Sequence, residues 1–450
     1  MTEQSLTDTL ARALPDLGPA QDARHTGHWR YAKGKDGINW LVLDCRNKRV
    51  NTVSQEVLRE LAEQLDQIEA DLPEALVIRS AKPAGFAAGA DISMLFDMAS
   101  GDITELLREA HAVLDRLEGL SCKTIAVVHG AALGAGCEIA LACDHRIAID
   151  GASFGLPEVR LGLHPGLGGT VRLPRLIDPL AAMTLMLTGS TAHTRKAKKL
   201  GIADLVTQER HVRAAIAAVK RGDVKGRKGG IRQRAFDLAP ARNLAAGRMR
   251  KETQAKAPQE HYPAPHALID LWAEHGGDRK AMQEAEIASF AKLLQTDTCR
   301  NLIRVFFLRR TLKDAAKPEN PDGETGDGIA AVHVIGAGVM GAEIAGWAAM
   351  QGKRVTLTDP DRAALGRAVA TAREICREAH LDDLQTRDAL DRLMPDPFGY
   401  GAAKADLVIE AGPEKPELKR KIFDDLSAVM KTGAILATNT SSLQLEDFVD

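Results

Sequence analysis

Two glutamates in an apolar, glycine-rich stretch place the strongest constraint on how this chain can fold. Glu138 opens an apolar run directly after a Gly/Ala-rich turn, and Glu158 follows the sequence Phe-Gly-Leu-Pro. A second glycine cluster comes soon after them, at 166–169. Burying a carboxylate is costly unless it is paired or performs chemistry, and glycines let the backbone come close to a ligand. The stretch therefore predicts a buried site where two carboxylates act as an acid/base pair on one small reactant.

The composition indicates a globular protein with more than one domain. At 450 residues, the chain has the length of about three ordinary domains. A hydrophobic content of 45%, a charged content of 27% and a net charge of −2 do not indicate nucleic acid or an anionic membrane as a partner. The cysteines lack metal-binding spacing, no HExxH or His/Cys cluster occurs, and we expect no metal site. Reduced thiols, together with the lack of an apolar span or leader in the sequence, favour a cytoplasmic location.

The pattern of elements predicts an α/β arrangement followed by helices. We expect strands at 37–44, 75–79, 124–128 and 145–149, and helices at 54–70 and 103–120. This alternation predicts α/β layering through residue 205. Strand signals nearly vanish from 206 to 316, helical spacing dominates 278–315, and 316–328 has the Pro, Gly and acidic residues of a linker.

A dinucleotide-binding motif follows that linker. A predicted strand at 330–335 leads into Gly-Ala-Gly-Val-Met-Gly, then a helix at 342–351 and a strand at 354–358 that ends in Asp359. Glycines here let the backbone approach a pyrophosphate at the start of the helix, and the acid would bond the ribose hydroxyls and repel a 2′-phosphate. The motif predicts NAD as the cofactor. Its candidate contacts are Gly336, Gly338, Val339, Met340, Gly341 and Asp359.

Several of these segments resemble known families. Residues 89–92, 134–138 and 154–158 resemble the signature of the enoyl-CoA hydratase (crotonase) family. Residues 331–342, 406–411 and 437–443 resemble the NAD domain of 3-hydroxyacyl-CoA dehydrogenases. Their order resembles the bifunctional α-subunits of bacterial fatty-acid oxidation complexes, with the C-terminal part missing.

The resemblance implies a fold and a domain order. It implies a crotonase (ββα spiral) domain at 1–205, a helical linker region at 206–327 and an incomplete Rossmann NAD-binding domain at 328–450. An acyl-CoA thioester is the implied substrate, and a thiolase subunit is a candidate partner. Neither nucleic acid nor membrane association is expected.

The resemblance also implies roles in hydration. Backbone N–H groups of Ala90 and Ala135 would form an oxyanion hole for the thioester carbonyl. Glu138 and Glu158 would hold one water and add it across the α,β double bond of a trans-2-enoyl-CoA. Many relatives have glycine at the position of Ala135. Alanine keeps the backbone N–H, but its added methyl group narrows the pocket. The alternative for the two glutamates is a salt-bridge or capping role.

In the dehydrogenase part the resemblance is incomplete. Asp359 matches the ribose-binding acid, Glu410 and Lys419 match positions near the nicotinamide, and Ser441 matches the serine that contacts substrate. Polar residues on a helix face and a strand end are the alternative for the last three. The family's catalytic histidine lies beyond the Asn-Thr-Ser-Ser sequence, and the sequence stops at Asp450 before it. We therefore expect NAD binding but hydride transfer only in a longer chain.

Weaker signals leave alternatives open. Residues 151–155 spell GxSxG, but Pro157 and a glycine-rich loop follow instead of the helix that a nucleophile elbow needs, which argues against Ser153 as a nucleophile. The basic run at 210–234 lacks aromatic residues and favours a solvated helix face or linker, with CoA phosphates or a partner subunit as the alternative. Lys48 and Arg49 are weak candidates for CoA phosphate contacts.

Function as a whole also has alternatives. Hydration, with Δ3/Δ2-enoyl-CoA isomerisation as an additional activity, is the first hypothesis. Another crotonase-fold acyl-CoA activity, or a non-catalytic CoA- and NAD-binding scaffold, are its rivals. The presence of both glutamates favours hydration.

Overall fold

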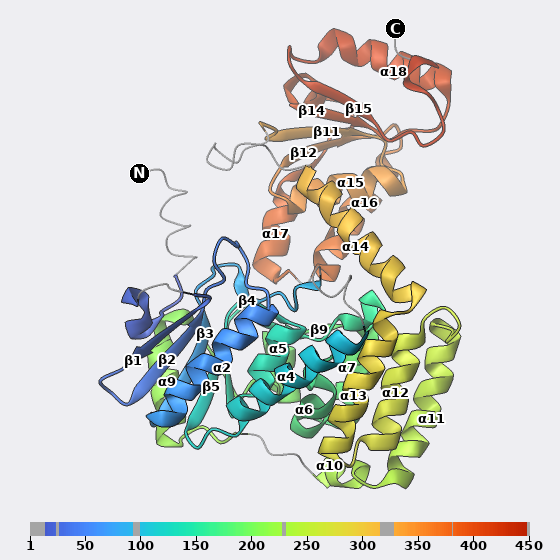
Figure 1. Cartoon of the computed structure of the whole chain (residues 1–450). Coiled ribbons are helices and arrows are strands. Elements are labelled where there is room, and N and C mark those ends of the chain that lie inside the picture. The colour runs from blue at the N-terminus through green and yellow to red at the C-terminus, as the bar shows by residue number, and fades with distance from the viewer. Residues whose placement is uncertain are drawn as a thin grey trace. The chain divides into compact units, whose positions relative to one another are not determined.

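A computed structural model describes residues 14–23, 27–92, 100–226, 231–315, 328–379 and 381–447. The chain divides into two compact units, Met1–Asp314 and Ala315–Asp450, each of which is described by itself (Figure 1). Among the residues described, no helix combines the length and the hydrophobicity that crossing a membrane requires.

Two sheets form the frame of the first unit. The six-stranded sheet has the order β1 (Trp29–Lys33), β2 (Ile38–Leu43), β3 (Ala75–Ser80), β5 (Lys123–Val128), β7 (His145–Ile149) and β10 (Leu205–Thr207). Only the β1–β2 pair in this sheet is antiparallel. The four-stranded sheet has the order β4 (Gly85–Ala87), β6 (Ala131–Leu133), β8 (Ser153–Gly155) and β9 (Thr191–His193). In it, β4, β6 and β8 are parallel and β9 is antiparallel.

From β3 to β8, consecutive strands alternate between the two sheets. β3, β5 and β7 lie in the larger sheet, and the strands that directly follow them, β4, β6 and β8, lie in the smaller one. Helices α4 (Ser100–Glu118) and α5 (Ala135–Leu141) close two of these turns, and α2 (Gln55–Ala70) precedes them. This repeat confirms the predicted ββα spiral. The three-residue strands of the smaller sheet were not expected from the sequence.

Amphipathic spacing explains the position of α2. The Ser54 side chain accepts a hydrogen bond from the backbone N–H of Val57, which caps the helix start as expected. Leu58, Leu61, Leu65 and Ile68 follow at helical spacing and are buried in the main core.

Helices that follow residue 230 pack onto the same core. They are α10 (Ile231–Phe236), α11 (Ala239–Lys256), α12 (Pro263–His275), α13 (Arg279–Leu294) and α14 (Asp297–Ala315). α11, α12 and α13 run side by side (Figure 1). Leu268, Trp272 and Ile287 share one buried cluster with Leu61 of α2. Much of the expected linker region thus contributes to the first unit; the domain limits themselves stay a prediction.

Part of the basic run lies on a helix that covers the larger sheet. α9 (Val212–Arg221) buries Val212, Ile216 and Val219 against that sheet, while the basic side chain of Arg221 is exposed. This arrangement fits the solvated-face interpretation over the described residues 210–226.

A five-stranded parallel sheet forms the second unit. Its order is β13 (Leu393–Pro395), β12 (Arg354–Thr358), β11 (Ala331–Ile335), β14 (Leu407–Glu410) and β15 (Ile435–Thr438). Its helices are α15 (Val339–Met350), α16 (Arg362–Glu378), α17 (Asp383–Asp391) and α18 (Pro416–Val429). α15 begins at Val339 rather than at residue 342, because Gly338 is its N-cap and the Val-Met pair already has helical geometry. The unit has the predicted Rossmann architecture.

Candidate active site

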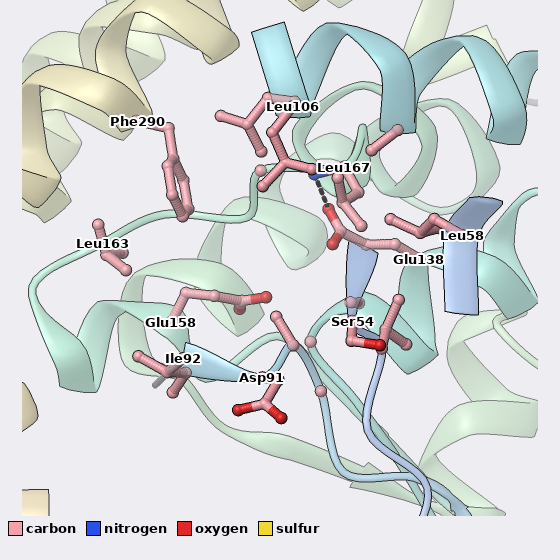
Figure 2. Close-up of a pocket in the computed structure, with 18 of the residues that line it drawn as sticks. Ser54, Leu58, Asp91, Ile92, Leu106, Glu138, Glu158, Leu163, Leu167 and Phe290 are labelled. Atoms are coloured by element: carbon pink, nitrogen blue, oxygen red, sulfur yellow. Dashed lines mark hydrogen bonds between the residues drawn. The ribbon is translucent and has the colours of Figure 1, made fainter. Parts of the chain in front are cut away.

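A pocket of about 130 Å³ lies in the first unit where three parallel strands end. β4, β6 and β8 are neighbours in the smaller sheet, so the segments that follow them meet at one edge. Ala90 follows β4, Glu138 lies on α5 after β6, and Glu158 follows β8. All three line the pocket, and both carboxylates point into it from different elements (Figure 2). The spiral thus brings together the glutamates that the sequence analysis singled out.

Glu138 is buried, and backbone groups hold one of its oxygens. Its Oε1 accepts hydrogen bonds from the N–H groups of Leu167 and Gly169, both at 2.8 Å. Burial, together with the charge of nearby Glu286, raises the pKa of Glu138 to about 7 despite these two bonds. Because the two donors favour the anion while burial disfavours it, this carboxyl can exist in either form near neutral pH.

Glu158 differs from Glu138 in its surroundings. Its residue is partly exposed, but Oε2 is buried and has no hydrogen-bond partner among the described residues. Burial and the neighbouring Glu138 raise the pKa of Glu158 well above its usual value. This carboxyl therefore keeps its proton to higher pH than an ordinary glutamate does.

Two glycines bring the backbone at Ala90 and Ala135 together. Gly89 and Gly134 have φ of 112° and 49°, and a Cβ on Gly89 would lie 3.9 Å from the Gly134 Cα. The bridge between Val53 and Ala90 uses the carbonyl of residue 89 and the amide of residue 91, so the Ala90 N–H points away from it. Ala135 is the first residue of α5, where an N–H has no intrahelical acceptor. Both residues line the pocket.

Apolar side chains from distant segments make up most of the remaining wall. They are Val53, Leu58, Leu106, Leu107, Leu161, Leu163, Leu167 and Phe290. Phe290 comes from α13 and was not expected at the site, because no local pattern indicates that this helix returns to the pocket. At the rim, Asp91 also lines the pocket and is paired with Lys48 at 2.8 Å.

Ser153 does not have the geometry of a nucleophile. It begins β8, and the chain continues through Pro157 into a short 3-10 helix, Glu158–Leu161, instead of a strand-to-helix elbow. His28, Glu56 and Glu60 form one cluster of metal-ligating side chains in the described chain. Both ring nitrogens of His28 are engaged there, with the Arg46 N–H at 3.1 Å and Glu56 at 3.3 Å, so the cluster carries no metal assignment.

In the second unit, the residues that the sequence proposed for NAD follow the carboxyl ends of parallel strands. Gly336 follows β11, Asp359 follows β12, Glu410 ends β14, and Ser441 follows β15. In open α/β sheets ligands bind at this edge. The topology therefore brings all four segments to the carboxyl edge of the sheet.

The three glycines of the motif meet different demands. Gly336 has φ of 98°, which favours glycine. A Cβ on Gly341 would lie 1.8 Å from the Gly336 carbonyl oxygen, whereas a Cβ on Gly338 would meet nothing within 4 Å. The open side at Gly338 fits the close approach of a pyrophosphate, and exposed Val339 and Met340 begin the helix beside it.

Asp359 lies directly beside this glycine turn. Its Oδ2 accepts a hydrogen bond from the Ala337 N–H at 2.7 Å, and its Oδ1 accepts one from the Asp361 N–H at 2.8 Å. The side chain is partly exposed, so it can reach a ribose that is bound over the turn. These residues fit a dinucleotide.

Glu410 and Lys419 contact each other instead of facing solvent. The Lys419 Nζ lies 2.6 Å from Glu410 Oε2, and both residues are fully buried. The Thr438 hydroxyl and the Gly412 N–H also donate to Glu410, each at 2.7 Å. Ser441 is exposed, and its N–H donates to Glu414 at 3.2 Å.

Comparison with known proteins identifies a relationship for each unit. Residues 34–227 match the sequence model of the enoyl-CoA hydratase/isomerase family, and residues 331–450 match that of the 3-hydroxyacyl-CoA dehydrogenase NAD binding domain. The fatty acid oxidation complex subunit alpha of Shewanella putrefaciens is 34% identical over 432 residues, which cover 92% of this chain and 60% of that protein. The protein of the same name from Aliivibrio fischeri is 33% identical over 436 residues, with coverages of 94% and 62%. The chain thus spans about three fifths of the length of these curated relatives.

A solved structure shares the fold of the first unit. The crystal structure of an enoyl-CoA hydratase from Rhodobacter sphaeroides aligns with a TM-score of 0.50 at 19% identity. The alignment covers 65% of this chain and 95% of that one. At this level of identity the likeness supports the fold alone.

Proposed function

We propose that the chain acts in fatty-acid β-oxidation, because residues 34–227 match the enoyl-CoA hydratase/isomerase family and residues 331–450 match the NAD binding domain of 3-hydroxyacyl-CoA dehydrogenases. In this proposal its first unit adds water to a trans-2-enoyl-CoA and forms the 3-hydroxyacyl-CoA. The observation that carries the proposal is the pair of glutamates that face one pocket from successive turns of the spiral.

The two glutamates divide the proton transfers. Glu138 acts as the base that takes a proton from water, because two backbone N–H groups stabilise its anion. Glu158 acts as the acid that delivers a proton to Cα, because burial and the charge of its neighbour favour its protonated form. The water oxygen bonds to Cβ, the double bond becomes an enolate, and the proton from Glu158 completes the product.

Backbone amides stabilise the charge that develops on the thioester oxygen. The N–H group of Ala90 points away from the bridge to Val53, and the N–H group of Ala135 has no acceptor within its own helix. Both residues lie beside the two glutamates. Such preorganised donors each contribute about 10²–10³ in rate. The apolar wall with Leu106 and Phe290 supplies contacts for the acyl group.

In the second unit we propose that the turn at Gly336 and the carboxylate of Asp359 hold NAD. When bound, NAD supplies hydride-acceptor chemistry. The chain's own residues bind and orient it: the glycine turn receives the pyrophosphate, and Asp359 bonds the ribose hydroxyls. The contact of Ser441 with substrate stays a prediction, as do Glu410 and Lys419 as nicotinamide contacts. The thiolase partner and the cytoplasmic location also stay predictions.

An assay with crotonyl-CoA tests the hydratase proposal. Loss of the enone-thioester absorbance, with 3-hydroxybutyryl-CoA identified by chromatography, is the expected result. A 3-enoyl-CoA in the same assay measures isomerase activity. Binding of crotonyl-CoA without any turnover would favour the scaffold alternative, and turnover to another product would favour a different crotonase-fold activity.

A further inference from the structure

A buried pair of titratable side chains lies behind the glycine loop at 166–169. Glu286 on α13 is 0% exposed and His111 on α4 is 4% exposed, and His111 Nε2 lies 3.1 Å from Glu286 Oε1. Glu286 lies outside residues 34–227, the part of the chain that matches the enoyl-CoA hydratase/isomerase family. A buried pair of this kind is weak evidence for stability, since its desolvation offsets most of its attraction. Its contacts indicate another role.

This pair holds the loop that holds Glu138. The Gly168 N–H donates to Glu286 at 2.8 Å, whereas the N–H groups of Leu167 and Gly169 on either side donate to Glu138. Successive amides of one loop thus alternate between the two carboxylates. The Gly166 carbonyl lies 3.1 Å from His111 Nε2 on the same side as Glu286.

Neighbouring groups leave the loop little freedom. The Thr170 hydroxyl donates to Glu286, and the Arg172 guanidinium donates to the Leu167 carbonyl at 2.9 Å. A Cβ on Gly169 would lie 2.9 Å from Glu138 Oε1, so the backbone is in close contact with that carboxylate. A shift of the loop would therefore move Glu138.

We propose that Glu286, together with His111, is a positioning residue of the hydratase site. It fixes the 166–169 loop so that two amides hold Oε1 of Glu138. The carboxyl points into the pocket (Figure 2), and its other oxygen is left for the reacting water. This inference rests on the proposed hydratase function. It makes α13, a helix of the expected linker region, part of the active site, together with Phe290 of the same helix.

Glu286 and His111 have opposite effects on the pKa of Glu138. The charge of Glu286 raises the pKa of Glu138, and the charge of His111 lowers it. Burial alone would lower the pKa of His111, but its bond to Glu286 and the attraction of that acid raise it overall. The other titratable groups that interact with the cluster are Glu158, His164 and Arg172.

Three variants test the proposal in the full chain. Glu286→Ala removes the anchor, and we expect kcat for crotonyl-CoA hydration to fall by about 10²-fold with little change in KM. Glu286→Gln and His111→Gln keep side-chain size and remove one charge each. The pH at which kcat rises, as Glu138 loses its proton and can act as the base, should therefore change in opposite directions. It should be lower in Glu286→Gln and higher in His111→Gln than in wild type.

A matched control lies on the same helix. Glu284 is 65% exposed and pairs with Arg108 at 3.6 Å, so Glu284→Gln should leave rate and profile unchanged. A double variant of Glu286→Gln with Glu138→Gln should lose no more activity than Glu138→Gln alone, since the effect passes through Glu138. Additive losses, or wild-type pH profiles in both charge variants, would overturn the proposal.

Hydrogen exchange gives a measure that does not depend on activity. The amides of 166–170 should exchange faster in Glu286→Ala than in wild type or Glu284→Gln, while the amides of β5 and β7 keep their protection. Unchanged exchange at 166–170 would overturn the anchoring role. A wild-type chain that fails to hydrate crotonyl-CoA would instead contradict the proposed function, and the exchange result would still decide whether Glu286 anchors the loop.

Discussion

Lys419 Nζ lies 2.6 Å from Oε2 of Glu410, and both side chains are shielded from solvent in the second unit. The pair joins α18 to the end of β14, and the Thr438 hydroxyl links it to β15. Three elements at the carboxyl edge of the sheet therefore depend on one buried charge pair.

Removing one partner of that pair should destabilise the second unit. Lys419→Met leaves the Glu410 carboxylate buried without its cation, which costs about 3–5 kcal/mol. Hydrogen exchange of β14 and α18 measures the loss in this unit alone. The control is Lys421→Met on the same helix, where the lysine is 73% exposed and lies 3.6 Å from Asp425. Equal protection in both variants would show that the pair contributes no stability.

The two glutamates of the first unit should each be needed for turnover. Glu138→Gln and Glu158→Gln should each lower kcat for hydration by about 10²-fold or more, with CoA-ester binding nearly intact. Steady-state kinetics and calorimetry with a saturated acyl-CoA separate the two effects. Glu63→Gln, on an exposed part of α2, is the control. Near-normal kcat in both glutamate variants would remove them from the acid/base roles.

The proposed role of the Ala135 N–H in the oxyanion hole can be tested without a change in charge. Ala135→Pro removes the N–H at the first helical position, where proline is tolerated, and should lower kcat by about 10²–10³-fold. Ala135→Gly keeps the N–H and should retain activity. Thermal unfolding checks that both variants fold. A proline variant as active as the glycine variant would contradict the oxyanion role of this amide.

Burial of Glu138 also predicts how stability depends on pH. Its pKa is raised from 4.5 to about 7, so the folded state holds a proton that the unfolded state has lost between these values. Stability from this group should therefore fall as pH rises through that window and then level off. Glu138→Gln should unfold at a higher temperature than wild type above pH 7, and the difference should shrink toward pH 4.5. A constant difference across this range would contradict the shift.

Nucleotide preference should depend on Asp359. The chain should bind NAD more tightly than NADP, because the carboxylate repels a 2′-phosphate. Asp359→Asn should narrow that preference by about tenfold or more. Isothermal calorimetry with both nucleotides measures it, and Asp361→Asn, which alters a helix cap two residues away, should keep the wild-type preference. Equal affinity for both nucleotides in the wild type would remove Asp359 from this role.

Elements with a strong local pattern could be predicted from the sequence. The helical spacing of Leu61 and Leu65 indicated α2, and the strand, glycine turn and Asp359 indicated the nucleotide-binding arrangement. The strands β4, β6 and β8 could not be predicted, because three residues are too few to show a period of two. Their pairing depends on partners that are distant in the chain.

The residues of the site that could not be predicted from the sequence are those that long-range contacts bring to it. Gly168 and Glu286 are 118 residues apart, and nothing near Glu286 in sequence distinguishes it from a surface acid on a helix. Glu410 and Lys419 were expected beside the nicotinamide, and their closeness to each other followed from the packing of α18 on β14. Glu138 and Glu158 were found because glycines and apolar residues surround both of them locally.

The return of α13 to the pocket of the first unit has a practical consequence for dividing this chain into fragments. A fragment that ends at residue 227, where the match to the hydratase family ends, would lack the phenylalanine in the pocket wall and the acid that binds the Gly168 amide. It would also lack Leu268, Trp272 and Ile287, which belong to the main core, and would so leave part of that core exposed. An independently expressed first unit should therefore extend through α14, and shorter fragments should be prone to aggregation.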